Sequence, residues 1–177
     1  MPRLKKSLGW LLTEVARYPR ATFLLLIIPL SLWMLDRAFP FRPRLDYSTQ
    51  VVASDGSLLY AYLNSTDKWR LEAELHEITP LLKRTILFKE DRYFYYHPGV
   101  NPLAICRAAL YNLIGGRRTS GASTLSMPVV RLLPPRPRTY ANKTIEMLRA
   151  LQLEWHYSKD EILQLYFNLV PYGGNIE

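Results

Sequence analysis

The sequence of 177 residues is long enough for one domain of ordinary size with an appendage, but too short for two full domains. Its single cysteine, Cys106, excludes an internal disulfide framework and a structural zinc site built from cysteines. With 23 Lys and Arg against 15 Asp and Glu, the formal net charge is +8. Such a charge suits either a nucleic acid or a membrane surface as a partner.

The positive charge and the apolar residues are concentrated near the N-terminus. Five basic residues against one acidic residue place half of the net charge in residues 1–20. Residues 21–35 carry no charge, and as a helix they would span about 22 Å of a hydrocarbon core that is ~30 Å thick. Arg20 at one end and Trp33 at the other suit the two membrane interfaces. We therefore predict a basic cytoplasmic tail over 1–20 and a transmembrane anchor over 21–38, with the rest of the chain outside the cytoplasm.

Residues 39–78 combine a proline-containing linker with a hairpin pattern. Pro40 and Pro43 favour an extended, stiff segment directly after the anchor. Two strand-like runs, 48–54 and 57–62, then flank Asp55-Gly56, a dipeptide that favours two-residue hairpin turns. The sequence thus predicts a juxtamembrane linker followed by a β-hairpin.

From residue 79 onward, caps and apolar spacing predict helices. Thr79-Pro80 and Asn101-Pro102 each place a capping side chain before a proline at the first helical position. Ser158 and Glu161 form a capping box before the last apolar run. Residues 140–156 carry a stripe of apolar side chains at helical spacing, namely Met147, Leu148, Leu151 and Trp155. No strand alternates with these helices, so a doubly wound sheet is excluded and the fold class is mainly α.

An acidic pair followed by aromatic residues is the first candidate site. Glu90 and Asp91 lie at the expected end of a helix, and they precede Tyr93, Phe94, Tyr95, Tyr96 and His97. A carboxylate in an aromatic-walled cleft would suit a general base. A helix end with its aromatic side chains in the core and its acids in water would explain the same residues without any chemistry. The pattern alone leaves both interpretations open.

Two further blocks carry polar groups. Ser123 and Thr124, with Arg131 nearby, would suit a phosphate or pyrophosphate, although a capping serine beside a solvated basic face is an equal alternative. In the block of Lys143 and Glu146, the glutamate lies off the centre of the apolar stripe and is expected to face a cleft or water. The other acids of the C-terminal helices are interpreted as helix-surface or capping residues: Glu154, Asp160 and Glu161. The three histidines are too far apart to predict a metal site.

Taken in order, these blocks resemble the peptidoglycan glycosyltransferase (family 51 transglycosylase) module of class A penicillin-binding proteins. The first motif of that family is matched by Glu90, Asp91, Phe94, His97 and Gly99. The second is matched by Gly121, Ser123, Thr124 and Ser126, and the third by Lys143 and Glu146. The fourth is matched by Lys159, Ile162, Leu163, Tyr166 and Asn168. Four motifs in order over residues 46–177 are far more specific than any one of them.

The resemblance implies a fold and an activity. It implies a lysozyme-like helical lobe over residues 79–177 that joins lipid II into β-1,4 glycan strands, with inversion and release of undecaprenyl pyrophosphate. Glu90 would be the general base and Glu146 the second catalytic acid, next to a divalent cation, Mg²⁺ or Mn²⁺, as the one cofactor. The implied substrate-binding residues are Asp91, Phe94, His97, Ser123, Thr124, Arg131, Lys143 and Asn168.

The same resemblance implies partners and a location. The partners would be lipid II, the growing glycan strand, the membrane and other cell-wall synthesis proteins. Nucleic acid is excluded, because the positive charge lies at the membrane end or in motif positions. The chain would be a single-pass protein of the bacterial inner membrane, with its N-terminus in the cytoplasm and its catalytic part in the periplasm.

The chain also departs from the family pattern. Met127-Pro128 replaces a pair of glutamines, and Asn142 replaces an arginine. Pro128 would break a backbone bond in a helix that starts at Ser123, unless the helix begins near Pro128 itself. The sequence stops after the fourth motif, so we expect a partial glycosyltransferase domain. Two alternatives therefore stay open, namely an inactive remnant that binds lipid II or a cell-wall partner, and a lysozyme-like glycan-cleaving enzyme.

Overall fold

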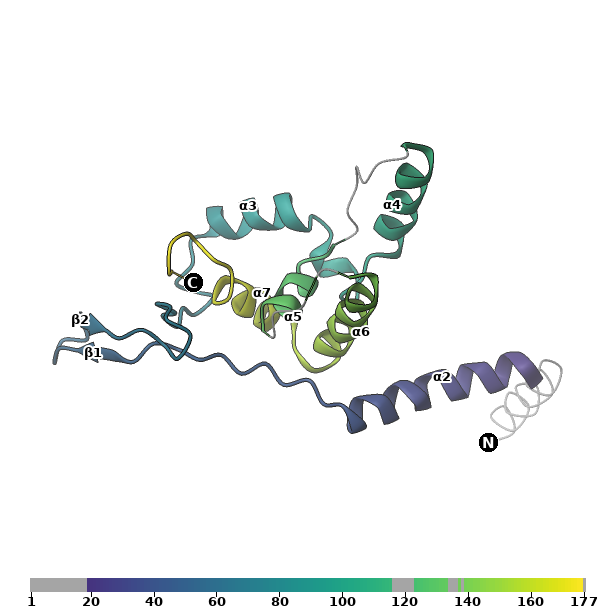
Figure 1. Ribbon diagram of the computed structural model, residues 1–177, viewed down its shortest axis with the longest axis horizontal. Coiled ribbons are helices and arrows are strands. Elements are labelled where there is room, and N and C mark those ends of the chain that lie inside the picture. Colours follow the sequence, from purple (N-terminus) through teal and green to yellow (C-terminus); the bar gives the residue numbers. More distant parts are fainter. Residues whose placement is uncertain (1–18, 116–122, 134–136, 138, 177) are drawn as a thin grey trace, which may run out of the picture. The chain divides into compact units, whose positions relative to one another are not determined.

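The computed structural model describes residues 19–115, 123–133, 137 and 139–176, so most of the basic tail and the loop over 116–122 lie outside the described part of the chain. The chain divides into two compact units, Met1–Phe41 and Arg42–Glu177. In the first unit, α2 runs from Pro19 to Ala38 as one helix with Pro29 inside it (Figure 1). No helix in the described ranges is both long and apolar enough to cross a membrane. The transmembrane anchor over 21–38 thus stays a prediction.

The predicted hairpin is confirmed in the second unit. Strands β1, Gln50–Val52, and β2, Leu58–Ala61, pair antiparallel, and the register shifts between Val51 and Val52. In the turn, Gly56 has φ +83°, a conformation that glycine adopts without a steric penalty. The Asp55 carboxylate accepts hydrogen bonds from the backbone and the hydroxyl of Ser57, at 2.9 and 2.7 Å. The turn thus includes Asp55-Gly56 as the sequence predicts, but it is longer than two residues, because the Gly56 N–H donates to the Ala53 carbonyl at 3.0 Å and the Ala53 N–H donates to the Ser57 carbonyl at 2.9 Å.

The predicted helix starts are confirmed as well. Helix α3, Pro80–Glu90, is capped by Thr79, and the Asn101 side chain accepts from Ala104 N–H at the start of α4, Pro102–Gly115. Between them lies a 3₁₀ turn, η1, Phe94–Tyr96. Helix α6 spans Tyr140–His156, and α7, Lys159–Phe167, begins with the predicted capping box. A mainly helical fold with one small two-stranded sheet follows, whereas the lysozyme-like arrangement stays a prediction.

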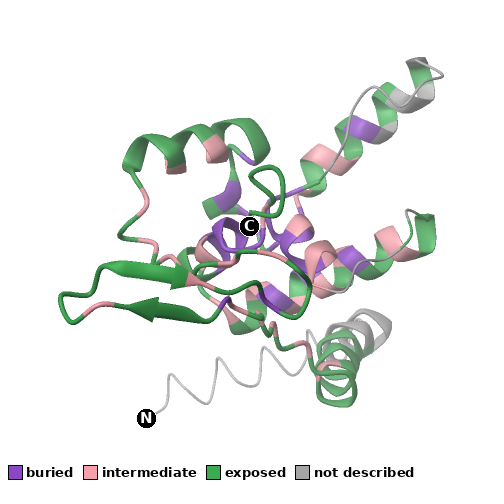
Figure 2. Ribbon diagram, turned by 60° about the vertical axis from the view of Figure 1, so that its left-hand side comes forward, coloured by how far each residue is buried: buried purple, intermediate pink, exposed green. Residues whose placement is uncertain are grey.

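The core of the second unit lies between α6, α7 and the short helix α5, Ser126–Leu132, which packs against both (Figure 1). Figure 2 shows the buried residues gathered on these three helices, whereas α3 has no buried residue along its whole length. The largest fully buried apolar side chains are Phe94, Leu125, Met127, Leu153, Ile162, Leu163 and Leu169. The third and fourth sequence motifs therefore lie on the core helices α6 and α7. The first motif contributes one side chain, Phe94, to the same core.

The inward face of α6 differs from the predicted one. Its buried residues are Glu146, Ala150 and Leu153, while Leu148, Leu151 and Trp155 of the predicted stripe are exposed. The prediction that Glu146 lies off the buried face is wrong. The larger apolar side chains on the exposed face of α6 led to the wrong choice of buried face. Hydrophobic spacing alone does not show which side of a helix the rest of the protein covers.

Candidate active site

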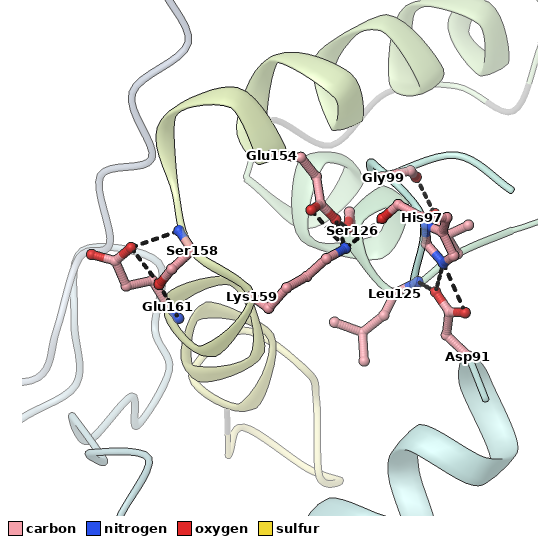
Figure 3. A network of polar contacts seen from close by, with 10 residues as sticks. Asp91, His97, Gly99, Leu125, Ser126, Glu154, Ser158, Lys159 and Glu161 are labelled. Carbon is pink, nitrogen blue, oxygen red and sulfur yellow. Dashed lines mark hydrogen bonds and ion pairs between the residues drawn. The ribbon is translucent and has the colours of Figure 1, made fainter. Parts of the chain in front are cut away.

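Asp91 holds three segments of the site together. It ends α3 by donating its backbone N–H to the Leu87 carbonyl at 3.0 Å. Its buried carboxylate accepts from the backbone N–H of Leu125 at 2.9 Å and from Nε2 of His97 at 2.9 Å (Figure 3). Since an ionised carboxylate only accepts hydrogen bonds, Nε2 of the His97 ring carries the proton. This Asp91 clamp joins the end of α3, the turn at residue 97 and the residue that precedes α5.

A second buried bond joins the first motif to the second. The Thr124 hydroxyl donates to the Gly99 carbonyl, and Thr124 is only 2% exposed. Gly99 has φ +82°, and a Cβ atom there would lie 2.6 Å from the Ala150 carbonyl oxygen of α6. The turn after His97 is thus pressed against α6 at a place where only glycine fits. Asp91, His97 and Thr124, predicted to bind substrate, each form side-chain hydrogen bonds within the protein, whereas Nδ1 of His97 is buried without a hydrogen-bond partner among the described residues.

Glu90, one residue before this clamp, is free. It is the last residue of α3, it is exposed, and its carboxylate makes no hydrogen bond or ion pair with the described part of the chain. The Arg131 guanidinium, in the last turn of α5, likewise has no partner within the same ranges. A rigid backbone thus carries a carboxylate and a cation that are both available to a ligand.

Tyr166 lies within electrostatic reach of both groups and was not predicted as a site residue. Burial and, to a smaller extent, the charge of Glu90 raise the pKa of its phenol to about 12, and Arg131 opposes this effect. The charges at the ends of α3 and α5 therefore both act on this phenol of α7. The only signal in the sequence is its position in the fourth motif, because a tyrosine on an apolar helix face is most simply a core residue.

The third motif forms a separate polar group. The Lys143 ammonium donates to the Ser123 hydroxyl at 2.9 Å and to the Glu146 carboxylate at 3.2 Å. Glu146 is buried, whereas Ser123 is exposed. The structure thus brings together the second and third motifs, as predicted, with the lysine as the bridge. An ammonium held between a hydroxyl and a buried carboxylate is a preorganised site for an anion.

Asn168 is committed to the backbone of a distant segment. Its amide accepts from the N–H of Ala73 at 2.9 Å and donates to the carbonyl of Ala73 at 3.0 Å. The residue is 2% exposed. Its side chain thus attaches the segment before α3 to the end of α7.

The departures from the family pattern have a structural explanation. Met127 is 1% exposed and packs in the core, so this side chain does not face the site. Helix α5 begins at Ser126, which places Pro128 in the first turn. The alternative that the helix begins near Pro128 is therefore confirmed, and no intrahelical bond is lost there. Asn142 donates its amide to the Pro137 carbonyl at 2.8 Å.

An apolar cavity lies elsewhere in the second unit. A space of about 620 Å³ is bordered by β2, the segment over 69–78, α3, α7 and the C-terminal segment. Of the predicted site residues it touches only Asn168. It offers no free charge that could act on a sugar or a phosphate, so we place the candidate site at Glu90 instead.

No metal centre is evident in the described part of the chain. It contains no group of three or more His, Cys, Asp or Glu side chains that could hold a metal ion. The carboxylate of Glu146, the predicted metal ligand, forms an ion pair with the Lys143 ammonium at 3.2 Å. The Mg²⁺ or Mn²⁺ ion at a pyrophosphate stays a prediction from the motifs.

Comparison with known proteins shows the family of this chain. The family model described as transglycosylase matches residues 55–177, so the chain belongs to the transglycosylase family. It is 41% identical to penicillin-binding protein 1C of Escherichia coli (strain K12) over 178 residues, which cover 100% of this chain and 22% of that protein. It is 36% identical to penicillin-binding protein 1A of the same organism over 132 residues, or 73% of this chain and 15% of that protein.

Penicillin-binding protein 1B of Haemophilus influenzae (strain ATCC 51907 / DSM 11121 / KW20 / Rd) is 40% identical over 118 residues, or 66% of this chain and 15% of that protein. The whole of this chain aligns with penicillin-binding protein 1C, but it spans only about a fifth of the length of that protein. The likeness to class A penicillin-binding proteins, first indicated by four motifs, thus extends over the whole sequence.

Proposed function

We propose that this chain is a peptidoglycan glycosyltransferase of cell-wall synthesis that joins lipid II into β-1,4 glycan strands. The proposal rests on membership of the transglycosylase family and on one observation of the site. Glu90 is an exposed carboxylate without a hydrogen-bond or ion-pair partner among the described residues, and the neighbouring Asp91 clamp fixes the backbone that carries it. Such a carboxylate is available to take a proton from a sugar hydroxyl.

The proposed reaction has one displacement step. Glu90 takes the proton of the acceptor's 4-hydroxyl, and the resulting oxygen forms a bond to the anomeric carbon of the donor sugar. The bond between that carbon and the pyrophosphate oxygen breaks, the configuration inverts, and undecaprenyl pyrophosphate leaves with the electron pair. The carboxylate must stand within hydrogen-bond reach of the acceptor hydroxyl in the bound state.

The leaving group needs positive charge. Negative charge develops on the pyrophosphate as the bond breaks, and preorganised donors stabilise it best. We propose that the free Arg131 guanidinium and the Lys143 ammonium, held by Ser123 and Glu146, supply this charge. Arginine suits the role because its planar fork can contact two phosphate oxygens.

A lipid-linked substrate places the enzyme at a membrane surface. We propose that the second unit works at the periplasmic face of the cytoplasmic membrane, and that the first unit attaches the chain to the bilayer. Along α2, large apolar side chains are exposed, among them Phe23, Ile28, Leu30 and Met34. The basic residues of 1–20 would add attraction to anionic lipids.

The test is Glu90→Gln. Polymerisation of lipid II should fall by about 10²- to 10⁴-fold, because the amide cannot accept the proton. The melting temperature should hardly change, since Glu90 is exposed and makes no bond that the folded state needs. Glycan chains can be separated by gel electrophoresis after incubation with labelled lipid II.

The matched control is Glu72→Gln, another exposed glutamate outside the site. It should polymerise like the unmodified chain. Wild-type polymerisation by Glu90→Gln would refute the proposal. Lipid II binding without any product would identify a non-catalytic binding protein, and cleavage of purified sacculi would identify a glycan-cleaving enzyme.

A further inference from the structure

A second polar cluster lies behind the Asp91 clamp, and the reaction proposed above does not use it. The Lys159 ammonium donates to both oxygens of Glu154, at 2.8 and 2.7 Å, and to the His97 carbonyl at 2.6 Å (Figure 3). It also lies 4.4 Å from the centre of the Phe94 ring. The lysine side chain is 21% exposed and the glutamate side chain 6%. Glu154 is therefore not the helix-surface residue that the sequence predicts.

This cluster holds both sides of the clamp. On one side, Lys159 binds the carbonyl of His97, whose ring donates to Asp91. On the other side, Glu154 accepts from the Ser126 hydroxyl, and Ser126 follows Leu125, whose N–H donates to Asp91. Figure 3 shows these residues as one continuous network of polar contacts. The ion pair of Lys159 and Glu154 thus connects both sides of the Asp91 clamp to α6 and α7.

The ion pair itself is held rigidly. Lys159 is the first residue of α7, directly after the Ser158 cap, whose capping box with Glu161 fixes the start of the helix. On the opposite side, a Cβ atom at Gly99 would come within 2.8 Å of Cγ of Glu154. The backbone at the start of α7 and the turn at Gly99 thus hold the two residues close together.

Stability alone does not account for such a pair. Removing two charges from water is costly, and apolar pairs of similar volume are often as stabilising. What apolar side chains lack are directed hydrogen bonds to two separate segments. We propose that Lys159 is a positioning residue which, through Glu154 and the His97 carbonyl, holds the backbone that presents Glu90. This inference rests on the proposed function.

The experiment compares variants of the full chain with lipid II as substrate. In Lys159→Met, Glu154 stays buried without its partner, so both the melting temperature and kcat should fall. The double variant Lys159→Met/Glu154→Gln removes both charges and should recover the melting temperature. Its kcat should nevertheless stay about 10- to 100-fold low, with KM within about threefold, because misplacement of a reacting group lowers the rate.

Two further variants serve as controls. Lys159→Arg keeps the cation and should retain kcat within about threefold. Asp160→Asn changes the next residue of the same helix, whose side chain accepts only from Tyr95 within the described chain, and it should retain wild-type kcat. A double variant with wild-type melting temperature and wild-type kcat would overturn the inference.

A failure of the proposed function would look different, because the unmodified chain itself would then form no glycan. Hydrogen exchange decides the inference in that case. At equal melting temperature, the Leu125 amide, which donates to Asp91, should exchange faster in the double variant than in the unmodified chain. Equal exchange at Leu125 would overturn the positioning role of Lys159.

Discussion

At position 99, two features of the surroundings require a glycine. The backbone has φ +82°, where an L side chain is strained, and a Cβ atom would lie 2.6 Å from the Ala150 oxygen. Gly56 has almost the same torsion, φ +83°, but has open space around it. Substitution of each glycine by alanine therefore distinguishes two losses of stability. Both positions have the backbone strain, and only position 99 also has the steric contact.

We expect Gly99→Ala to lower the free energy of unfolding by about 2 to 4 kcal/mol, from left-handed strain and overpacking together. Gly56→Ala should lower it by about 1 kcal/mol, from the torsion alone. Denaturant unfolding of both variants measures the difference. Equal losses would show that α6 yields to the added methyl group.

The raised pKa of Tyr166 makes the stability of the protein dependent on pH in the alkaline range. Burial, followed by the charge of Glu90, raises the pKa of its phenol to about 12, whereas the unfolded chain has a value of about 10. The folded state keeps the proton to higher pH, so its stabilising contribution is complete below pH ~10 and is lost as the pH rises toward ~12. The free energy of unfolding should fall by a few kcal/mol over this range.

Tyr166→Phe should reduce this alkaline loss, as measured by denaturant unfolding at pH values of about 8 and 11. Tyr96→Phe is the control, because the Tyr96 ring is 87% exposed. The same alkaline loss in both variants would contradict the assignment to Tyr166.

At the scale of elements, the short helix α5 shows how position decides what a proline does. Pro128 is the third residue of the helix, and a backbone N–H there would have no partner within the helix. We expect Pro128→Ala to change the free energy of unfolding by less than about 1 kcal/mol.

A proline in the middle of α6 is the comparison. Leu151→Pro should cost about 3 kcal/mol or more, because it removes an intrahelical hydrogen bond and clashes with the preceding turn. Both variants can be compared by thermal unfolding. A large loss in Pro128→Ala would show that the proline ring itself is needed at the start of α5.

At the scale of the whole molecule, the proposed membrane attachment belongs to the first unit. Ile28 and Met34 on α2 are 51% and 59% exposed. If these side chains enter a bilayer, Ile28→Asp/Met34→Asp should weaken binding to anionic lipid vesicles by about tenfold or more. Co-sedimentation with vesicles measures the change.

Leu59→Asp is the control for this experiment. Leu59 is a similarly exposed apolar residue, but it lies on the hairpin of the second unit. Vesicle binding should be retained in this variant. If Ile28→Asp/Met34→Asp binds vesicles as well as Leu59→Asp does, α2 is not the attachment.

The sequence by itself determined the local structure of this protein. The caps at Thr79, Asn101 and Ser158 and the Asp55-Gly56 turn form as predicted, because each depends on residues within a few positions of one another. The four motifs also sufficed to indicate the family, since their order and spacing are specific.

Only the tertiary structure decided which of the motif residues are free to act. Asp91, His97, Thr124 and Asn168 form hydrogen bonds within the protein, whereas Glu90 and Arg131 form none with the residues that the structure describes. The inward face of α6, and with it the burial of Glu146 and of Glu154, was also decided there. The physical reason is that burial and pairing depend on contacts between helices far apart in the sequence. Apolar spacing indicates that one side of a helix is covered, but it does not indicate which segment covers it.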